Sequence, residues 1–285
     1  MFKIVSKQKI APKEFDMWVE ADRIAKHAKA GQFVVLRVDD KGERIPLTIA
    51  DYDKEKGLIR LIFQVVGKTT AAMSCLNVGD SIKDISGPLG TPSEVEKFGT
   101  VLMVGGGVGI AALYPIIKEL KMAGNKVITI LGGRTSELVV MKEECAEYSD
   151  ELIITTDDGS EGMKGVVTEA MKMVVERGDK IDRCWCIGPS IMMKFGTKAA
   201  KELGLPIFVS LNPLMVDGTG MCGCCRVTVD DKIFFACVDG PEFDGHKVNW
   251  DEFMSRLRQY KDEEKISMDK FVAEVGEPSA ANQAK

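Results

Sequence analysis

The apolar positions of this chain change their rhythm twice along the sequence. In residues 2–90 they fall in short runs bounded by Gly, Asp and Lys. The runs Phe15 to Val19, Phe33 to Val38 and Leu58 to Val66 are typical of β-strands. We therefore expect a β-rich, barrel-like domain at the N-terminus.

From Thr100 onward, near-continuous apolar runs alternate with helical patterns. This alternation predicts five parallel strands with helical crossovers, which is a doubly wound α/β sheet. The Gly and Pro residues of Gly87 to Pro92 mark the boundary with the first domain. The predicted strands are Val101 to Val104, Val127 to Leu131, Leu152 to Thr155, Arg183 to Ile187 and Ile207 to Val209, and the main predicted helices are Ile110 to Met122, Val166 to Glu176 and Ser190 to Leu203.

The pattern changes again after Leu211, where a loop rich in Gly and Cys begins. A strand pair is predicted around Val227 to Val229 and Phe234 to Ala236, followed by a polar helix from about Trp250 to Tyr260. We expect the Ala/Gln/Ser/Pro tail at 277–285 to be frayed.

Composition narrows the class of protein. The chain has 285 residues, of which 45% are hydrophobic and 28% charged, and this suits two folded domains rather than a fibre or a disordered chain. The net charge of -5 argues against a broad footprint for nucleic acid or an anionic membrane. The longest uncharged stretch, Gly99 to Ile117, contains several glycines and Pro115, so we interpret it as a strand, a turn and a helix.

The chain contains eight cysteines, and its start, Met1 to Lys7, lacks an apolar signal core. Together these features predict the reducing cytoplasm, where the thiols are free, catalytic or bound to metal. Four of them stand among apolar residues and are expected to fill the core: Cys75, Cys145, Cys184 and Cys186.

The most specific motif is the Gly/Cys-rich loop. It runs Asp217-Gly218-Thr219-Gly220-Met221-Cys222-Gly223-Cys224-Cys225 and is followed, after eleven residues, by Cys237. A glycine-laced loop can bend around a compact cluster, so that Cys222 and Cys225 chelate from one turn and Cys237 arrives on a hairpin. Asp217 stands five residues before Cys222, where a plant-type Cys-x4-Cys-x2-Cys run has its first cysteine, and a carboxylate oxygen can bind iron.

This motif predicts an iron–sulfur site with four ligands, Asp217, Cys222, Cys225 and Cys237. Cys224 is expected to be a spare thiol. A structural zinc on the same four residues and ordinary buried cysteines are the alternatives.

The second motif is a glycine turn between an apolar strand and a helix, Gly105-Gly106-Gly107-Val108-Gly109. Glycines let a pyrophosphate approach the backbone, and a helix N-terminus offers unpaired N–H groups; a turn made only for tight packing is the alternative. Because ligands of open parallel sheets bind at the carboxyl ends of the strands, three later strand ends belong to the same crevice. They are Gly132-Gly133-Arg134, Thr155 to Gly159 and Gly188-Pro189-Ser190.

The third motif combines two segments of the β-rich domain, Arg44-Ile45-Pro46-Leu47-Thr48 and Gly67-Lys68-Thr69-Thr70. An arginine fork suits a pyrophosphate, and a Thr hydroxyl suits the edge of a flavin ring. A surface arginine and a helix cap are the alternative interpretation.

Together the three motifs resemble the ferredoxin-NADP reductase superfamily over about residues 2–245. Their order is similar to that in the electron-transfer subunit of dihydroorotate dehydrogenase, in which all four cluster ligands are cysteine. Asp217 and the roughly forty residues beyond the cluster loop resemble instead the small subunits of electron-bifurcating NADH-dependent reduced ferredoxin:NADP oxidoreductases, whose cluster is held by one aspartate and three cysteines.

The resemblance implies a division into a β-barrel FAD-binding domain (1–98), an α/β NAD-binding domain (99–210), an iron–sulfur cluster loop and hairpin (211–248) and a C-terminal helix and tail (249–285). The implied cofactors are FAD, a 2Fe-2S cluster and NAD(H), with NADP(H) left open. No side chain is expected to act as the catalytic group, since the cofactors perform the bond changes.

The implied FAD residues are Arg44, Pro46, Leu47, Thr48, Gly67, Lys68, Thr69 and Thr70, and the implied NAD(H) residues are Gly105, Gly106, Gly107, Val108, Gly109, Gly132, Gly133, Arg134, Asp157, Gly188 and Pro189. Thr69 departs from the Gly-Lys-Gly-Thr of many relatives. Ile187 stands where many relatives have a cysteine, so Cys186 receives no catalytic role.

The resemblance implies an electron-transfer flavoprotein subunit that passes hydride and electrons between NAD(H), FAD and the cluster within an electron-bifurcating NADH/ferredoxin:NADP oxidoreductase. The implied partner is a larger iron–sulfur flavoprotein subunit, with ferredoxin reached through it, and the C-terminal helix packs on that partner or on its own domain. The alternatives are the electron-transfer subunit of an NAD-dependent dihydroorotate dehydrogenase, a non-catalytic zinc-binding nucleotide or redox sensor, and a sulfur or polysulfide reductase subunit.

Overall fold

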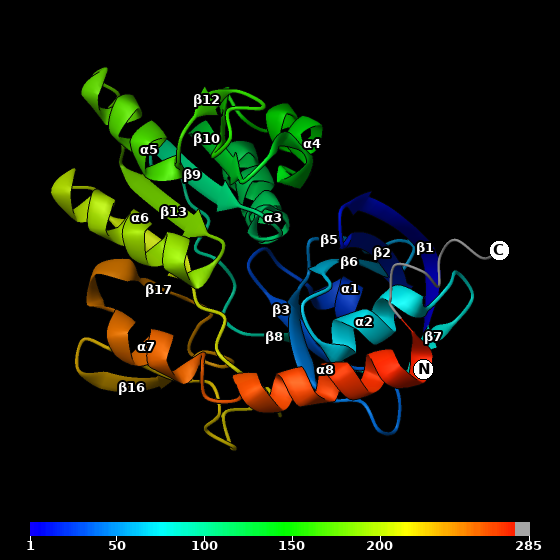
Figure 1. Ribbon diagram of the computed structural model, residues 1–285. Coiled ribbons are helices and arrows are strands. Elements are labelled where there is room, and N and C mark those ends of the chain that lie inside the picture. The colour runs from blue at the N-terminus through cyan, green and yellow to red at the C-terminus, as the bar shows by residue number, and fades with distance from the viewer. Residues whose placement is uncertain (277–285) are drawn as a thin grey trace.

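The N-terminal strands form a barrel-like pair of sheets in the computed structural model, which describes residues 1–276 (Figure 1). Within those residues, one sheet has the strand order β5-β6-β2-β1-β7 and the other β4-β3-β8. The elements are β1 (Phe2–Ala11), β2 (Glu14–Glu20), α1 (Asp22–His27), β3 (Phe33–Arg37), β4 (Ile45–Thr48), β5 (Asp51–Asp53), β6 (Leu58–Gln64), α2 (Lys68–Cys75), β7 (Ser81–Ile82) and β8 (Asp84–Leu89).

Strand β6 is buried on both of its faces, which explains its near-continuous apolar sequence. Because side chains alternate along a strand, Ile59 and Leu61 face the barrel interior, while Arg60 and Ile62 face the opposite way. Ile62 packs in a second cluster with residues of the following domain. Strand β6 therefore forms part of the contact between the two domains.

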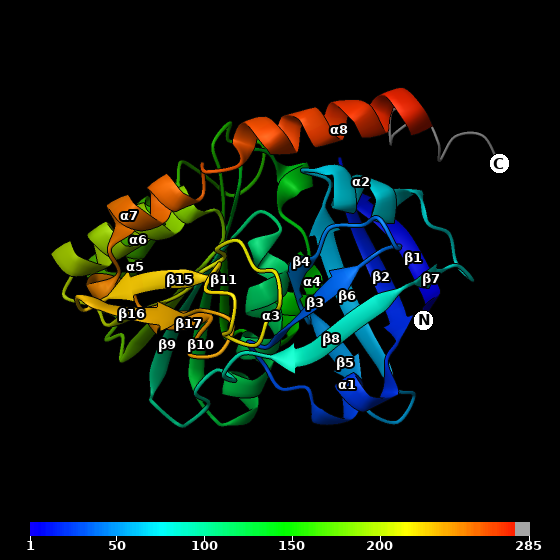
Figure 2. The same ribbon diagram turned by 90° about the horizontal axis from the view of Figure 1, so that it is seen from below.

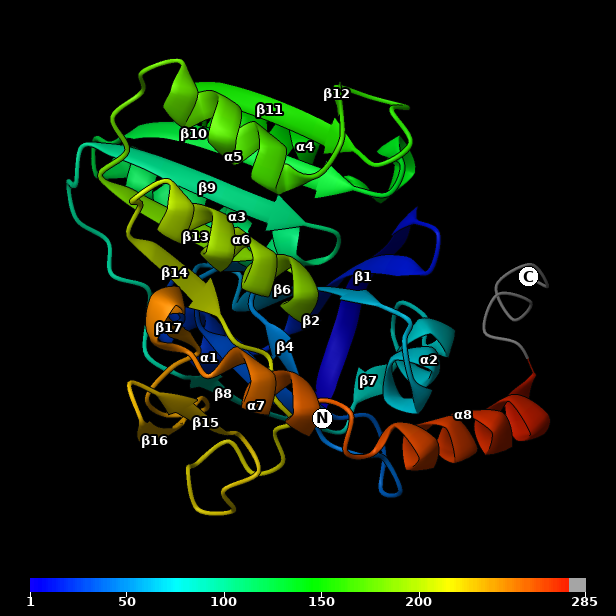
Figure 3. The ribbon, with the colours of Figure 1, turned by 60° about the vertical axis from the view of Figure 1, so that its left-hand side comes forward.

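The second domain is a doubly wound sheet (Figure 3). Among the described residues its order is β12-β11-β10-β9-β13-β14-β17, parallel except for β17, which pairs antiparallel with β14. The elements are β9 (Thr100–Gly106), α3 (Gly109–Met122), β10 (Lys126–Gly133), the 3-10 helix η1 (Ser136–Leu138), α4 (Lys142–Glu147), β11 (Glu151–Thr156), β12 (Met163–Lys164), α5 (Val167–Glu176), β13 (Arg183–Ile187), α6 (Ser190–Glu202), β14 (Ile207–Ser210) and β17 (Glu242–Asp244).

Alternate residues of β9 bind the two helical layers to the sheet. Leu102 and Val104 pack in the cluster that contains α5 and α6, whereas Val101 and Met103 pack in the cluster that contains α3 and α4. The chain order reverses on either side of β9, and in such sheets ligands bind outside the carboxyl ends of the strands at this point. The predicted parallel sheet and its five main strands are confirmed.

The C-terminal part is built onto the second domain. A hairpin of β15 (Arg226–Val229) and β16 (Lys232–Phe235) precedes β17 and the 3-10 helix η2 (Gly245–Lys247), and two helices follow, α7 (Trp250–Arg256) and α8 (Lys261–Val275). The predicted helix from about Trp250 begins where expected but ends at Arg256 instead of Tyr260, and the second helix, α8, which begins at Lys261, was not predicted. Apolar spacing continues through this break, with no Gly or Pro to mark it.

The two C-terminal helices have different surroundings. Phe253 of α7 is buried in the core of its own domain, and Trp250 Nε1 donates a hydrogen bond to Gly245 O at 3.1 Å. Helix α8 crosses the barrel beside α2 (Figure 2), and every one of its side chains keeps part of its surface exposed. The tail predicted to be frayed, 277–285, lies outside the described residues. Within residues 1–276, every helix is too short or too polar to cross a lipid bilayer.

Candidate functional site

A crevice of about 1220 Å³ lies between the barrel and the carboxyl ends of the parallel strands. Small-molecule pockets are commonly about 300 to 1,000 Å³, so this crevice has room for more than one large ligand. Its wall on the barrel side comes from β4, β6 and the start of α2, and its opposite wall comes from the glycine turn and the strand ends.

The glycines of the turn differ in their surroundings: one faces open space and two are closely packed. A Cβ added at Gly107, where φ is 52°, would meet no atom within 4 Å, so space lies in front of this backbone. A Cβ at Gly109 would lie 2.5 Å from Gly188 Cα, and one at Gly105 would lie 3.0 Å from Leu113 Cδ2. Gly107 thus leaves room for a ligand, while Gly105 and Gly109 allow strand and helix to pack closely.

The predicted nucleotide residues of the other strand ends meet at the same wall. Arg134 and Asp157, which are both exposed, follow β10 and β11 and bring opposite charges to one region of the crevice. Asp157 N donates to Gly133 O at 3.1 Å, which ties these two strand ends together. All the predicted NAD(H) residues except Gly105 line the crevice: Gly106, Gly107, Val108, Gly109, Gly132, Gly133, Arg134, Asp157, Gly188 and Pro189.

On the barrel side, only some of the predicted flavin residues line the crevice. Pro46, Leu47 and Thr48 of β4 line the crevice. Arg44 is exposed and precedes β4, outside the lining residues. The β4 residues therefore form the barrel wall at this point without the arginine.

The Gly67 to Thr70 segment makes local contacts of its own. Thr70 lines the crevice, but its hydroxyl oxygen accepts hydrogen bonds from Val66 N at 3.0 Å and Gly67 N at 3.1 Å. Lys68 Nζ lies 3.7 Å from Glu43 Oε1. Thr69 is buried, and its Oγ1 has no hydrogen-bond partner among residues 1–276. The hydrogen bonds of Thr70 are those of a helix cap, which was the alternative interpretation of this segment. The buried hydroxyl of Thr69 is left without a hydrogen-bond partner within residues 1–276.

Sequence reasoning missed Glu14, a fully buried carboxyl group in the crevice wall. Its Oε1 accepts a hydrogen bond from Gln64 Nε2 at 3.1 Å, and its Oε2 has no partner within the described part of the chain. Burial raises the pKa of Glu14 to about 7, although the bond from Gln64 acts in the opposite direction. No local signal marks this residue, since it stands at the start of an ordinary strand.

Other missed residues come from the end of β14 and from β6. Ser210 and Asn212 line the crevice, and Ser190 Oγ donates to Asn212 Oδ1 at 2.9 Å. The strand-end rule applied to the last parallel strand would have found both. Phe63, Gln64 and Val66 also line the crevice, with no comparable signal.

The cysteine loop is organised by the carboxylate of Asp217. Its Oδ1 accepts a hydrogen bond from Thr219 N at 2.8 Å and its Oδ2 accepts one from Cys222 N at 2.9 Å. These bonds, with that from Thr219 N the stronger influence, lower the pKa of Asp217. Gly218, Gly220 and Gly223 have φ values of 77°, 81° and 67°, which other residues rarely adopt. The sequence of glycines thus permits the tight loop that brings Asp217 to Cys222.

The remaining two predicted ligands form a second pair. Cys225 and Cys237 are buried, and their Sγ atoms lie 3.2 Å apart. Burial raises the pKa of Cys237 to about 12. Two thiolates bound to one tetrahedral metal at about 2.3 Å each lie roughly 3.7 Å apart, so this pair needs only a small adjustment to share a metal ion.

Among the four predicted ligands, Cys225 and Cys237 bring their Sγ atoms together, and Asp217 meets Cys222 through the backbone N–H of Cys222. Within residues 1–276, the structure gathers no group of three or more His, Cys, Asp or Glu side chains that could hold one metal ion. In a two-iron cluster each iron takes two protein ligands. Three thiols and one carboxylate at this spacing fit such a cluster.

The other cysteines match their expected role as core residues. Cys145, Cys184 and Cys186 are buried and Cys75 is half-buried. Burial raises the pKa of Cys145 to about 12 and that of Cys186 to about 12, so these thiols stay protonated.

Two family models match the chain. A model of the oxidoreductase NAD-binding domain matches residues 103–198, and a model of the iron-sulfur cluster binding domain of dihydroorotate dehydrogenase B matches residues 212–249. The second match contains the whole cysteine loop and all four predicted ligands.

Two relatives cover almost the whole chain. A Thermotoga maritima protein described as a homolog of the dihydroorotate dehydrogenase B (NAD(+)) electron transfer subunit is 58% identical over 275 residues, which are 96% of this chain and 96% of the relative. The dihydroorotate dehydrogenase B (NAD(+)) electron transfer subunit of Streptococcus pneumoniae is 34% identical over 249 residues, which are 85% of this chain and 94% of the relative.

Solved structures agree with these relationships. A chain in the structure of NADH-dependent reduced ferredoxin-NADP oxidoreductase, studied for flavin-based electron bifurcation, is 58% identical, with a TM-score of 0.90 over 95% of this chain and 97% of that one. A ferredoxin NADP+ reductase from Neisseria gonorrhoeae matches with a TM-score of 0.57 and 20% identity over 71% of this chain and 90% of that one, which shows the fold alone. The predicted combination of a flavin-type barrel, a parallel-sheet domain and a C-terminal iron–sulfur module is confirmed.

Proposed function

The chain belongs to the family of dihydroorotate dehydrogenase B electron-transfer subunits, and on that premise we propose that it passes hydride and electrons between NAD(H), FAD and a 2Fe-2S cluster. The observation that carries this proposal is the joint presence, in one chain, of the two-walled crevice and the paired ligands of the cysteine loop. It is an oxidoreductase subunit in which the protein binds and orients the redox groups.

The two walls of the crevice have separate roles in this proposal. Pro46, Leu47 and Thr48 hold the flavin ring from the barrel side, and the open backbone at Gly107 holds the dinucleotide with the N-terminus of α3 behind it. A flavin bound there would supply the exchange between two-electron hydride chemistry and one-electron transfer to the cluster. More of the accessible lining of the crevice is apolar than polar, so bound cofactors would displace water from much of it.

Contacts between the cysteine loop and the barrel support a direct electron path. A Cβ added at Gly218 would lie 2.6 Å from Leu89 Cδ1 and 3.3 Å from Val35 Cγ2, so the loop rests on β8 and β3. Val35 is the cross-strand partner of Pro46, which lines the crevice. The loop is thus one strand away from the proposed flavin contact, which is the arrangement that transfer between flavin and cluster requires.

Two observations favour a place in an NADH-dependent reduced ferredoxin-NADP oxidoreductase. One is the 58% sequence identity to a chain of that enzyme, and the other is the position of the Asp217 carboxylate beside Cys222. Under this proposal a larger iron–sulfur flavoprotein subunit is the partner, ferredoxin and NADP(H) react at that partner, and the complex bifurcates electrons. We also propose NADH as the nucleotide of this chain and the cytoplasm as its location.

The second candidate is the electron-transfer subunit of an NAD-dependent dihydroorotate dehydrogenase. The observation that favours it is the 34% identity to the Streptococcus pneumoniae subunit over most of both chains. The two candidates share the reactions inside this chain and differ in the protein that receives the electrons.

A native purification distinguishes the two. The chain is tagged in its own cell, purified without oxygen, and its partner is identified by mass spectrometry. We expect a stoichiometric larger subunit rich in iron and flavin. A flavin-bearing dihydroorotate dehydrogenase as partner would select the second candidate, and recovery of the chain only as a homo-oligomer would contradict both.

A further inference from the structure

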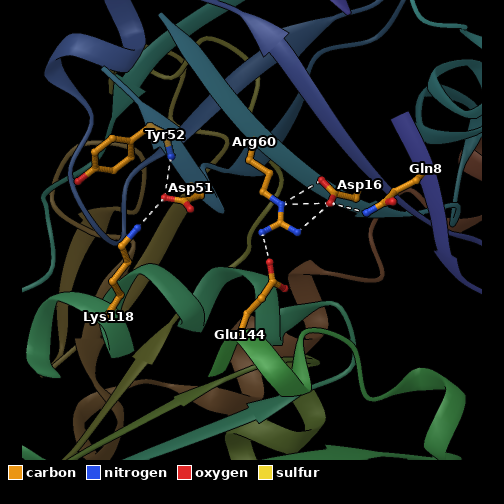
Figure 4. A network of polar contacts seen from close by, with 7 residues as sticks. All are labelled: Gln8, Asp16, Asp51, Tyr52, Arg60, Lys118 and Glu144. Atoms are coloured by element: carbon orange, nitrogen blue, oxygen red, sulfur yellow. Dashed lines mark hydrogen bonds and ion pairs between the residues drawn. The ribbon is translucent and has the colours of Figure 1, made fainter. Parts of the chain in front are cut away.

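Outside the lining of the crevice, the two domains are joined by a buried guanidinium (Figure 4). Arg60 of β6 donates from Nε to Asp16 Oδ1 at 3.0 Å and from Nη2 to Asp16 Oδ2 at 2.8 Å, within the barrel. Its Nη1 donates to Glu144 Oε1 at 2.6 Å, on α4 of the second domain. We call these three residues the Arg60 bridge.

The Arg60 bridge contains one more carboxylate than the charge of Arg60 requires. Arg60 and Asp16 are 8% and 3% exposed, and together they already form a neutral, bidentate pair. Burial alone would lower the pKa of Arg60, but the hydrogen bonds that Arg60 donates to Asp16 and Glu144 raise it above its usual range. Glu144 is therefore not needed to neutralise the barrel, and its contact serves to attach α4.

A second set of polar contacts joins the barrel to α3. Tyr52 Oη donates to Glu119 Oε1 at 2.8 Å, and Lys118 Nζ lies 3.4 Å from Asp51 Oδ1. Helix α3 begins at Gly109 in the crevice wall, so these contacts fix the same rigid element that presents the glycine turn. Barrel and second domain are thus held at two separate places, α3 and α4.

The Glu144 side chain itself borders open space. A cavity of about 480 Å³ adjoins the bridge, lined by residues of β1, β6, η1 and α4 that include Arg60 and Glu144. Apolar contact between the domains lies beside it, where Ile62 shares a buried cluster with Val139 and Val140, just before α4. The hydrogen bond from Arg60 to Glu144 is therefore a polar link from the barrel to α4 at the edge of this contact.

The bridge is also close to the crevice. Arg60 and Ile62 lie two residues apart on the same face of β6, a separation of about 7 Å along a strand. Arg60 lines the small cavity, and Ile62 lines the crevice. A change in the distance between α4 and β6 therefore reaches the crevice through a single strand.

We propose that the hydrogen bond from Arg60 to Glu144 sets the separation of the two crevice walls, so that Glu144 is a positioning residue for hydride transfer between the dinucleotide and the flavin. This inference rests on the proposed function, because it assumes a flavin on one wall and NAD(H) on the other. Loss of the bond widens or tilts the crevice while each wall keeps its own binding residues.

The test compares Glu144→Ala with Glu143→Ala in the native complex, since alanine removes the acceptor oxygen that glutamine would keep. Glu143 is the exposed neighbour on the same helix and also borders the small cavity, so both variants remove one negative charge at the same place. The measurements are flavin reduction by NADH in stopped flow, flavin content, melting temperature and hydrogen exchange of the amides in residues 142–147.

For Glu144→Ala we expect the reduction rate at saturating NADH to fall about tenfold or more, since misplacement by 1 Å can cost about 100-fold. The NADH dissociation constant, flavin content and melting temperature should stay near those of the unmodified protein, while exchange in 142–147 becomes faster. Glu143→Ala should resemble the unmodified protein in every measurement.

Two results would overturn the inference while leaving the proposed function intact. One is a Glu144→Ala protein that reduces its flavin at the unmodified rate. The other is a loss of flavin and of thermal stability in proportion to the loss of rate, which would indicate a purely structural role. If NADH left the flavin of the unmodified protein oxidised, the proposed function itself would fail, and this inference with it.

Discussion

The Sγ atoms of Cys225 and Cys237 lie 3.2 Å apart, although the two residues come from a loop and from the end of a hairpin. Asp217 and Cys222, the other two predicted ligands, meet through the hydrogen bond from Cys222 N to the Asp217 carboxylate. The close approach of the two sulfur atoms suits a shared iron, because each iron of a two-iron cluster takes two protein ligands.

The first prediction concerns the carboxylate ligand. We expect Asp217→Ala to lower cluster content strongly, because the change removes a ligand and also the acceptor of the Thr219 and Cys222 backbone bonds. Asp217→Cys should keep the cluster with an altered reduction potential. Iron and sulfide assays with electron paramagnetic resonance measure both effects.

A suitable control for this prediction is Asp158→Ala. Asp158 is an exposed aspartate whose Oδ1 accepts a hydrogen bond from Ser160 N at 2.9 Å, so it resembles Asp217 in its local bonding but lies far from the cysteines in sequence. Cluster content unchanged in Asp217→Ala would remove Asp217 from the ligand set.

The second prediction separates the cysteines of the loop. Cys225→Ser and Cys237→Ser should each abolish the cluster, since either change leaves one iron with a single thiolate of the pair. Cys224→Ser should retain it, because the plant-type spacing places the ligands at Cys222 and Cys225 and leaves Cys224 between them. The visible absorption of anaerobically purified protein reports the result, and a colourless Cys224→Ser protein would show that the ligands have been assigned wrongly.

The third prediction concerns the choice of nucleotide. Asp157 brings a negative charge to the crevice, which disfavours the additional phosphate of NADPH, whereas the neighbouring Arg134 would favour it. We expect NADH to be preferred and Asp157→Asn to reduce this preference about tenfold. Initial rates with both nucleotides and an artificial acceptor measure it.

Asp158→Asn provides the matched comparison for Asp157→Asn, since Asp158 follows it directly and lies outside the crevice lining. Equal changes in the two variants would mean that general surface charge, rather than Asp157, sets the preference.

The fourth prediction follows from the buried Glu14. Its pKa is raised from 4.5 to about 7 by burial, so between these values the folded protein holds a proton that the unfolded chain has lost. The free energy of unfolding should therefore fall relative to that of Glu14→Gln as the pH rises from 4.5 to about 7, by about 3 kcal/mol, and stay level above 7. Chemical denaturation at several pH values measures the difference.

Glu20→Gln is the control for this titration, because Glu20 lies exposed at the other end of β2. A difference between the unmodified protein and Glu14→Gln that did not vary with pH would contradict a raised pKa at Glu14.

The features that the sequence predicts well are carried by neighbouring residues. The glycine turn at 105–109 and the loop from Asp217 to Cys225 are continuous segments whose spacing already contains their geometry. The apolar run of β6 likewise predicts a buried strand. Such local patterns do not determine which residues a side chain contacts in the folded protein.

The features that the sequence does not predict depend on distant residues. Glu14 is buried beside Gln64, fifty positions away, and Arg60 meets Glu144 across 84 positions. Neither pairing leaves a periodic signal. The end of α7 was also missed, because Leu257 continues the apolar spacing beyond Arg256 and no Gly or Pro interrupts it.

The most direct test of the central claim is the cofactor content of the chain purified without oxygen. Iron, sulfide, zinc and flavin are assayed together with absorption and electron paramagnetic resonance spectra before and after NADH is added. We predict a brown protein with about two iron, two sulfide and one FAD per chain, whose flavin absorption bleaches with NADH. A colourless protein with stoichiometric zinc, or one that takes up neither iron nor flavin after reconstitution, would contradict the account.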